Sequence, residues 1–260
     1  MTTTPAMPSR LRMKRINDPV RQARIDLAAA FRCAGRLKWQ EGIGGHFSLR
    51  VPGRDDLFLL NPLGVFWSEI RASDLLVVDF EGKKVEGAGE VERTAFCIHA
   101  HIHRAGGDDA HCVFHTHTPY ATGLATLKTP RFEFIQQGSL RFYDDVAYDS
   151  EFNGLVTDDA EGARIAAVMG GKRALFLANH GTIVTGPTVA TTFQYTYMLE
   201  RVCMYMALAR MHGIPLQTIR DEVGRRTRPI YRSEPLSLEP GLYLDALKRK
   251  LDREEPDYAE

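Results

Sequence analysis

The sequence lacks any hydrophobic run long enough to cross a membrane. Its longest apolar stretches are 174–178 and 202–209, far shorter than the ~20 residues that a transmembrane helix needs. The N-terminal residues also lack the apolar stretch and the small-residue cleavage site of a signal peptide. We therefore expect no membrane partner and a cytoplasmic location.

Cysteine is scarce in this sequence. The four cysteines are Cys33, Cys97, Cys112 and Cys203, and no two of them form a CxxC pair. Three of them lie in the apolar stretches AFCIH, HCVFH and RVCMYM, where a free cysteine behaves as a small core side chain. This pattern predicts reduced cysteines, as is usual in the cytoplasm.

An excess of charge of either sign is also absent. The chain of 260 residues has 33 Lys and Arg against 33 Asp and Glu, and 44% of its residues are hydrophobic. This balance excludes a globally basic nucleic-acid-binding protein and an acidic disordered chain. Residues 1–24 are a local exception, with six basic residues and one acidic residue. We expect residues 1–19 to form a flexible basic arm, and we expect no nucleic-acid partner.

Hydrophobic periodicity predicts one α/β domain over residues 20–232. Helical spacing predicts helices at 20–40, 92–105, 119–127, 158–170, 187–212 and 241–253. Short apolar or alternating runs predict strands at 47–51, 57–61, 74–80, 111–117 and 173–181, with a further strand within 81–87 and strand-rich connecting structure over 134–150. Because several strands are joined by tight turns, part of the sheet must be antiparallel. Residues 233–260 hold the last helix and an acidic tail, which we expect to dock on the domain or on a neighbouring subunit.

Three histidines form a candidate metal site. His115 and His117 lie two residues apart in a predicted strand, so both side chains point to the same face. His180 stands at the end of another apolar strand, in the sequence Asn-His-Gly. An isolated His-x-His pair also occurs by chance, but its position in a strand and the histidine at a strand end favour a metal. Three histidines with one open position are typical of catalytic zinc.

The predicted helix over 92–105 carries three further histidines. Glu92, His99 and His103 share one helical face, whereas His101 lies on another. A histidine stripe that begins at an acidic residue can reach the same pocket as the metal site. The alternative is that His99 is a hydrogen-bonded core histidine and that His101 and His103 are surface residues.

Several motifs, in order, resemble the class II aldolase/adducin family over about residues 20–230. They are GIGGHFSLR, LLNPLGVFWSEI, SDLLVVD, IHAHIHRA, VFHTHTPYATGLA and ANHGTIVTGPTVATTFQYTYMLE. The resemblance implies a three-layer α/β/α fold with a mixed, mainly antiparallel central sheet. It implies a divalent metal held by His115, His117 and His180, most often zinc, with manganese, cobalt or iron as alternatives. It also implies a homotetramer with active sites at subunit interfaces.

The chemistry that the resemblance implies is cleavage of a carbon–carbon bond through a metal-stabilised enediolate. The sugar-phosphate aldolases of the family add a Glu as acid or base and a Tyr as proton donor. The Glu position is Ala95 here, and the nearest acid is Glu92, one turn earlier. We expect Glu92 to act as a proton shuttle, although a helix-start Glu is also explained by the helix dipole. Tyr143 is the candidate proton donor, with Tyr148 and Tyr258 as alternatives.

The expected substrate pocket also departs from the family pattern. The candidate substrate-binding residues are His46, Asn61, Gly64, Arg93 and Thr94. His46 replaces the family Asn, and Arg93-Thr94 stand where sugar-phosphate members carry Ser-Ser. A carboxylate held by Arg93 and His46 is therefore at least as plausible as a phosphate.

These features predict a metal-dependent lyase that acts on a small carbonyl or hydroxy/keto acid, by retro-aldol cleavage or decarboxylation. The missing Glu at position 95 favours decarboxylation, or aldol chemistry on a substrate without phosphate. Phe66, Trp67 and Phe134 are candidates for an apolar lining, with core packing as the alternative. The main alternative is a non-catalytic, adducin-like interaction module, against which the three retained histidines count. A zinc hydrolase ranks last, because no HExxH motif is present.

Overall fold

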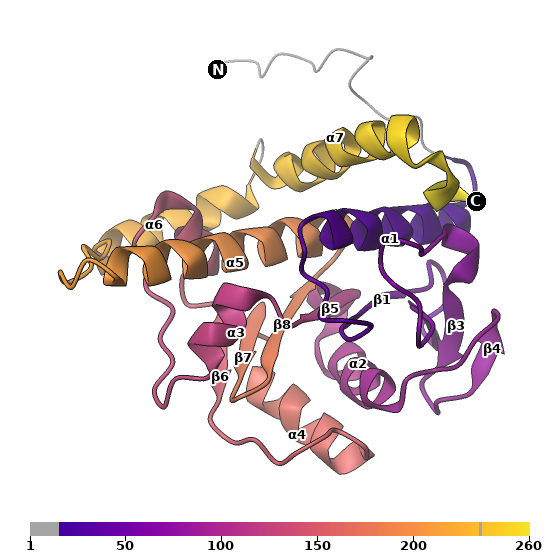
Figure 1. The fold of residues 1–260 in the computed structure, drawn as a ribbon, viewed down its shortest axis with the longest axis horizontal. Coiled ribbons are helices and arrows are strands. Elements are labelled where there is room, and N and C mark those ends of the chain that lie inside the picture. Colours follow the sequence, from indigo (N-terminus) through magenta and orange to yellow (C-terminus); the bar gives the residue numbers. More distant parts are fainter. Residues whose placement is uncertain (1–15, 234–235) are drawn as a thin grey trace.

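The computed structural model describes residues 16–233 and 236–260 (Figure 1). Most of the expected basic arm, residues 1–15, therefore lies outside the described residues. The helices are α1 (Pro19–Arg36), α2 (Arg93–Ala105), α3 (Pro119–Ala125), α4 (Asp159–Met169), α5 (Val189–Arg210), α6 (Asp221–Arg232) and α7 (Glu239–Glu254). The strands are β1 (His46–Arg50), β2 (Leu57–Leu60), β3 (Leu76–Asp79), β4 (Lys84–Glu86), β5 (Cys112–Thr116), β6 (Val146–Asp149), β7 (Ala174–Leu177) and β8 (Gly181–Gly186).

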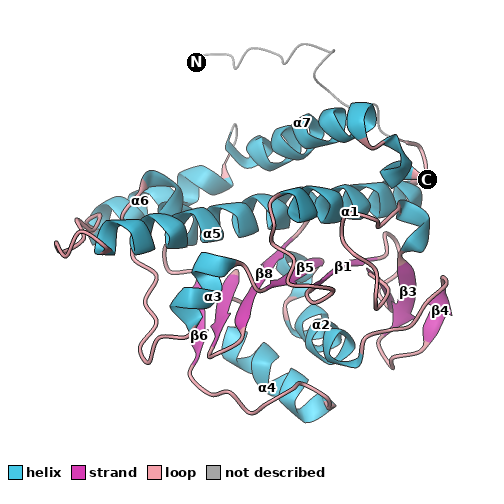
Figure 2. Ribbon diagram, viewed as in Figure 1, coloured by secondary structure: helices cyan, strands magenta, loops and turns pink. Residues whose placement is uncertain are grey.

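The strands form one sheet in the order β4-β3-β2-β1-β5-β8-β7-β6. Neighbouring strands run antiparallel, except for the parallel pair β6 and β7. Helices α1, α5 and α7 lie on one face of this sheet, and α2 and α4 lie on the other (Figures 1 and 2). This arrangement confirms the predicted three-layer α/β/α fold with a mixed, mainly antiparallel sheet.

The alternation of side chains along β1 and β5 separates the core from the functional face. Phe47 on β1 and Phe114 on β5 stack with their ring centroids 3.7 Å apart and pack towards α1 and α5. The residues on either side of each phenylalanine point to the opposite face, the face that α2 covers. His46 and Ser48 on β1 and His115 on β5 therefore share that face.

The predicted elements are present, with small shifts at their ends. Helix α1 begins at Pro19, where the Asp18 side chain accepts hydrogen bonds from the first free backbone N–H groups. Two elements are missing from the sequence-based prediction. Strand β8 is bounded by glycines at both ends and has few aliphatic residues. Helix α6 is strongly charged, contains Pro229 and buries only Gly224 and Tyr231.

The C-terminal segment docks on its own chain. Helix α7 packs against α1 and α5, and the Arg32 guanidinium on α1 lies 2.7 Å from the Asp257 carboxylate. Tyr258 is 1% exposed and donates to Asp252, so it is part of this chain's core and not a residue that reaches a neighbour's site. All four cysteines are free and buried, as predicted.

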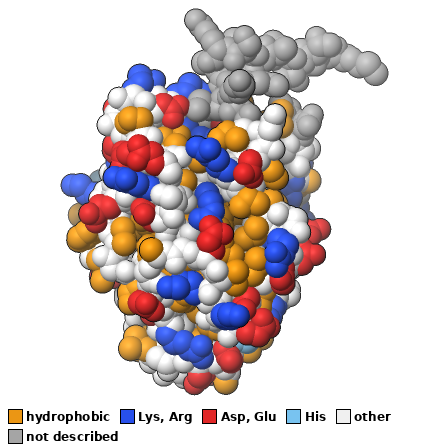
Figure 3. Space-filling model, turned by 90° about the vertical axis from the view of Figure 1, so that its right-hand side faces the viewer, with side chains coloured by type: hydrophobic (Ala, Val, Ile, Leu, Met, Phe, Trp, Pro, Cys, Tyr) orange, Lys and Arg blue, Asp and Glu red, His pale blue; other side chains and the backbone are white. Residues whose placement is uncertain are grey.

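The surface that Figure 3 draws carries Lys and Arg side chains interspersed with Asp and Glu. Among the described residues, this face therefore presents no continuous basic area. No helix within the same described ranges is both long enough and apolar enough to cross a membrane.

Candidate active site

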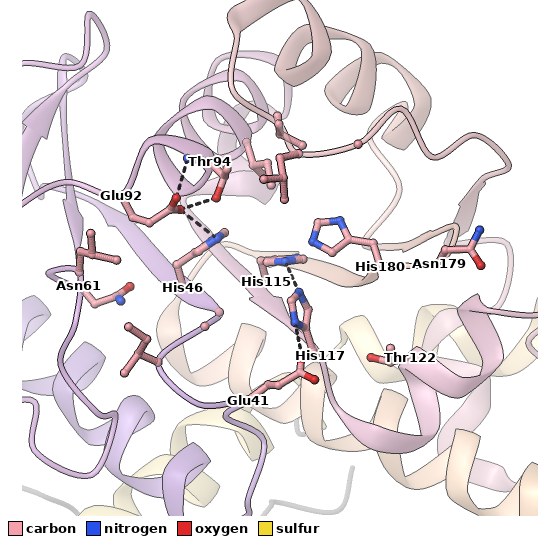
Figure 4. A pocket seen from close by; sticks show the side chains of 18 of the residues that line it. Glu41, His46, Asn61, Glu92, Thr94, His115, His117, Thr122, Asn179 and His180 are labelled. Carbon is pink, nitrogen blue, oxygen red and sulfur yellow. Dashed lines mark hydrogen bonds and ion pairs between the residues drawn. The ribbon is translucent and has the colours of Figure 1, made fainter.

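A cavity of about 580 Å³ lies where β1, β5 and the β7–β8 turn meet the start of α2 (Figure 4). Glycines allow the backbone to come close at two places on its wall. Gly45 has φ +84°, and a Cβ there would lie 2.8 Å from the Trp67 ring. A Cβ on Gly181 would lie 2.5 Å from the Thr116 carbonyl oxygen. These close approaches position His46 and His180, the neighbours of the two glycines, at the cavity.

The structure brings His115, His117 and His180 together at this cavity. Their ligand atoms all lie within 4.8 Å of one another, and the Nε2 atoms of His115 and His117 are 3.0 Å apart. The His180 ring centroid lies 4.6 Å from that of His115 and 5.0 Å from that of His117. His180 is delivered by a tight turn in which Asn179 adopts φ +53°, a conformation that Asn tolerates better than most residues.

The hydrogen bonds of two of these rings define their tautomers. The His115 Nδ1 atom lies 3.1 Å from the Thr182 carbonyl oxygen, which can only accept, so this nitrogen carries the proton. The His117 Nδ1 atom lies 2.7 Å from the Glu41 carboxylate, which accepts in the same way. Both Nε2 atoms are then bare in the neutral rings, and two lone pairs face each other.

A cation resolves this opposition of lone pairs. Two nitrogens bound at about 2.0–2.1 Å to a tetrahedral zinc ion are about 3.3 Å apart, close to the observed spacing. Burial and the neighbouring His180 hold the pKa of His115 well below its usual value. Burial and His117 lower the pKa of His180 to about 4. His115 and His180 are therefore held neutral, as metal ligands must be, and the set of three imidazole donors fits a divalent ion.

A chain of hydrogen bonds runs from the cavity into the layer between β1 and α2. The His46 Nδ1 atom lies 2.8 Å from the His99 Nε2 atom, and the other ring nitrogen of His99 contacts the Ser48 hydroxyl. The same hydroxyl is 2.7 Å from the His103 Nε2 atom, and the His103 Nδ1 atom is 2.6 Å from the Ala110 carbonyl oxygen. At the cavity end, this chain is accessible only through His46.

These hydrogen bonds support the expected burial of His99 and correct the expected exposure of His103. His99 is a buried, hydrogen-bonded core histidine, as one alternative predicted. His103 is fully buried and not a surface residue, because the helical face that it shares with His99 packs against β1 and not against solvent. His101 is half-buried and lies 3.5 Å from the Asp159 carboxylate of α4.

Glu92 lies at the cavity and also caps α2. Its carboxylate accepts hydrogen bonds from the backbone N–H groups of Thr94 at 3.0 Å and Ala95 at 2.6 Å, and from the Thr94 hydroxyl. One carboxylate oxygen lies 3.8 Å from the His46 Nε2 atom. The Glu92 side chain therefore caps α2 and lines the cavity at the same time.

The remaining predicted site residues divide into two groups. Asn61 and Thr94 line the cavity, and the Asn61 side-chain oxygen accepts from the Phe47 backbone N–H at 3.3 Å. Three predicted residues are absent from the described cavity lining, namely Gly64, Arg93 and Tyr143.

The contacts of Arg93 and Tyr143 explain why they lie elsewhere. The Arg93 guanidinium donates to the Thr157 carbonyl at 3.2 Å and lies over the Phe96 ring. The Tyr143 hydroxyl donates to Asp221 on α6, and α6 is a helix that the sequence pattern did not predict. Each side chain is thus held by a neighbouring element on the outside of the cavity.

Sequence reasoning missed several cavity residues. The residues concerned are Glu41, Ile43, Thr122, Phe152, Leu155 and Asn179. Glu41 directly precedes the Gly-rich turn and Asn179 directly precedes His180, so adjacency was an available signal for these two. Trp67 is fully buried in the core, as the core-packing alternative predicted, and Phe66 and Phe134 are absent from the cavity lining, so these aromatics do not form the apolar lining.

Comparisons with known proteins agree with this geometry. A family model described as Class II Aldolase and Adducin N-terminal domain matches residues 25–207. A Caulobacter vibrioides protein whose name places it in aldolase class 2 is 33% identical over 261 residues, covering 98% of each chain. Decarboxylase NovR of Streptomyces niveus is 34% identical over 202 residues, covering 77% of this chain and 74% of NovR.

A solved structure extends the agreement to three dimensions. The crystal structure of an aldolase II superfamily protein from Pseudomonas syringae superposes with a TM-score of 0.85 at 32% identity, covering 94% of this chain and 98% of that one. Motifs, fold and sequence identity along nearly the whole length thus lead to one conclusion. The chain belongs to the class II aldolase and adducin family.

Proposed function

We propose that this protein is a divalent-metal-dependent carbon–carbon lyase. Its substrate is a small carbonyl compound or a hydroxy or keto acid, cleaved by a retro-aldol reaction or by decarboxylation. The observation that carries the proposal is the convergence of three imidazoles: the Nε2 atoms of His115 and His117 lie 3.0 Å apart, and His180 completes the set within 4.8 Å. A non-catalytic scaffold does not need three imidazole nitrogens that converge on one point of a cavity.

The metal in this proposal is held by His115, His117 and His180, and zinc fits the donor set best. When bound, a divalent ion supplies Lewis-acid polarisation of a substrate carbonyl. Glu41 and the Thr182 carbonyl keep the two ligand rings in the required tautomer. Such outer partners commonly raise metal affinity and fix ring orientation.

Glu92 and His46 are the polar groups that face the substrate in this proposal. The Glu92 carboxylate can accept a proton from a substrate hydroxyl and hold it at the cavity, which is the proton-shuttle role. Ile43, Leu63 and Leu155 form apolar parts of the lining, and they would exclude water from the reacting bond. Tyr143 is not part of this proposal, since its hydroxyl is bound to α6.

The proposal includes a homotetramer. Several apolar side chains of the cavity lining are exposed in the single chain, and Leu155 is 80% exposed. Large exposed apolar areas mark protein contacts, and a neighbouring subunit would cover these residues. Light scattering after size exclusion tests this part, and a monomer at micromolar concentration would contradict it.

Metal analysis of the purified protein tests the function. We expect one divalent ion per chain, its loss in His115→Ala, and its retention in His212→Gln, which alters an exposed histidine at the end of α5. Keto acids and hydroxyaldehydes are then screened for release of carbon dioxide and aldehyde. A wild-type protein that holds no metal and cannot be reloaded would overturn the lyase and favour the interaction module.

A further inference from the structure

We propose that Ser48, His99 and His103 lock His46 in one tautomer, with its proton on Nδ1 and a bare Nε2 atom facing the cavity. The consequence for the proposed lyase is that its substrate carries a hydroxyl group at this end of the cavity. The three residues are positioning residues, since they act through His46. The tautomer of His46 follows from the geometry of the hydrogen bonds alone. That the ligand of this cavity is a substrate rests on the proposed function.

The direction of every hydrogen bond follows from the buried end of the chain. The Ala110 carbonyl can only accept, so the His103 Nδ1 atom, 2.6 Å away, carries a proton. In a neutral ring the His103 Nε2 atom is then bare and accepts from the Ser48 hydroxyl at 2.7 Å. Because the Ser48 hydroxyl has only one proton, which it donates to His103, its oxygen must accept a hydrogen bond from His99.

The same reasoning continues outward to the cavity. The His99 Nδ1 atom donates to Ser48, which leaves the His99 Nε2 atom bare. That atom lies 2.8 Å from the His46 Nδ1 atom and accepts from it. His46 therefore has no proton left for the nitrogen that faces the cavity.

The opposite direction would require a doubly protonated ring at His103. The ring is fully buried between β1 and α2, where a charge is costly. The Arg50 guanidinium donates to the backbone carbonyl of His103, so the charge beside this ring is positive and opposes a second proton. Burial also lowers the pKa of His103 to about 3, in agreement with a neutral ring.

At the cavity, the bare nitrogen faces a second acceptor. The His46 Nε2 atom and a Glu92 carboxylate oxygen are 3.8 Å apart (Figure 4). A carboxylate or phosphate placed there would be repelled, because its oxygen lone pairs would face the two acceptors, His46 Nε2 and the Glu92 carboxylate. A hydroxyl group can instead donate a hydrogen bond to one of these acceptors. This replaces the expectation that His46 and Arg93 hold a substrate carboxylate, since Arg93 is outside the cavity lining and His46 offers no donor.

Histidine NMR tests the tautomer directly. In ¹⁵N-histidine-labelled protein, long-range ¹H–¹⁵N correlations separate protonated from bare ring nitrogens, and His46→Asn assigns the His46 signals. We expect a protonated Nδ1 and a bare Nε2 for His46 in the wild type at pH 7.5. A protonated Nε2 atom, alone or with a protonated Nδ1, would overturn the proposal. The tautomer itself is read in the wild-type protein, and the variant serves only for assignment.

Variants then test whether Ser48 is responsible. Ser48→Ala removes the acceptor for His99, which can then donate to His46 instead, so we expect the His46 proton to move to Nε2. Ser48→Thr restores the hydroxyl and should restore the wild-type pattern. Thr196→Val removes an equally buried hydroxyl on α5 and should leave His46 unchanged. A wild-type pattern in folded Ser48→Ala would refute the role of Ser48.

Matched ligands test the hydroxyl. With zinc-loaded protein, 3-hydroxypyruvate is compared with pyruvate for an alcohol, and 4-hydroxyphenylpyruvate with phenylpyruvate for a phenol. We expect the hydroxylated member of at least one pair to bind about tenfold more tightly, and the pair that does so identifies the kind of hydroxyl. Equal binding within both pairs would overturn the substrate inference. Failure of the lyase proposal would appear separately, as a protein that holds no zinc, while the NMR result would stand.

Discussion

Acid should destabilise the protein through His103, which the fold holds neutral. Burial lowers the pKa of this ring from 6.5 to about 3, whereas the unfolded chain binds a proton near pH 6.5. The unfolded state therefore binds more protons between these two values, and stability is lost as the pH falls through that window. Each pH unit below 6.5 costs about 1.4 kcal/mol, so His103 alone should remove about 2 kcal/mol at pH 5.

Urea unfolding of the wild type and His103→Gln at pH 7.5 and pH 5.0 measures this contribution. Glutamine keeps a hydrogen-bond donor and an acceptor but does not titrate, so the variant should lose about 2 kcal/mol less than the wild type on acidification. His115, whose lowered pKa has other causes than His103, contributes equally to both proteins. His212→Gln, at an exposed position, should lose as much as the wild type. Equal losses in His103→Gln and the wild type would refute the reasoning.

Three further predictions follow from single contacts. Glu41→Gln should weaken zinc binding by about 10–100-fold, because it removes the carboxylate that orients a ligand ring; unchanged competition with a chromophoric chelator would contradict this. Gly45→Ala should lower the melting temperature much more than Gly42→Ala, since both have positive φ but only a Cβ at 45 meets a ring, at 2.8 Å; equal shifts would contradict it. Glu200→Ala should cost about 1–3 kcal/mol in urea unfolding, because this carboxylate accepts from two backbone N–H groups at the start of α3; a neutral effect would contradict it.

Most of the fold could be predicted because the helices carry apolar stripes and the buried strands are short runs rich in apolar residues. The helix over 20–40 was found from its apolar stripe, and the structure places that stripe against the sheet in α1. The pattern failed where this relation is weak. Strand β8 reads GTIVTG, so only two aliphatic residues stand between its threonines and glycines. Helix α6 is strongly charged and buries only Gly224 and Tyr231, so it has too few apolar residues to be recognised.

The candidate site was predictable where strand geometry dictates it. The spacing of His115 and His117 places both rings on one face, and this needs no knowledge of the fold. Arg93 and Tyr143 show the opposite case, because each position depends on a partner far along the chain. Thr157 holds Arg93, and α6 holds Tyr143. Local sequence patterns do not indicate contacts between residues so far apart in the chain.

The chemistry of the cavity argues for one branch of the proposed function. Cleavage by a retro-aldol reaction begins with loss of a proton from a substrate hydroxyl, whereas decarboxylation needs no such base; both reactions leave a carbanion that must later receive a proton. Glu92 and His46 face the cavity as acceptors, 3.8 Å apart, and the hydrogen-bond chain leaves His46 no proton to give. A site supplied with acceptors suits the first reaction better than the second. The missing Glu at position 95 favoured decarboxylation from the sequence alone, but the carboxylate at the cap of α2 reaches the cavity from one turn earlier and restores an acceptor there.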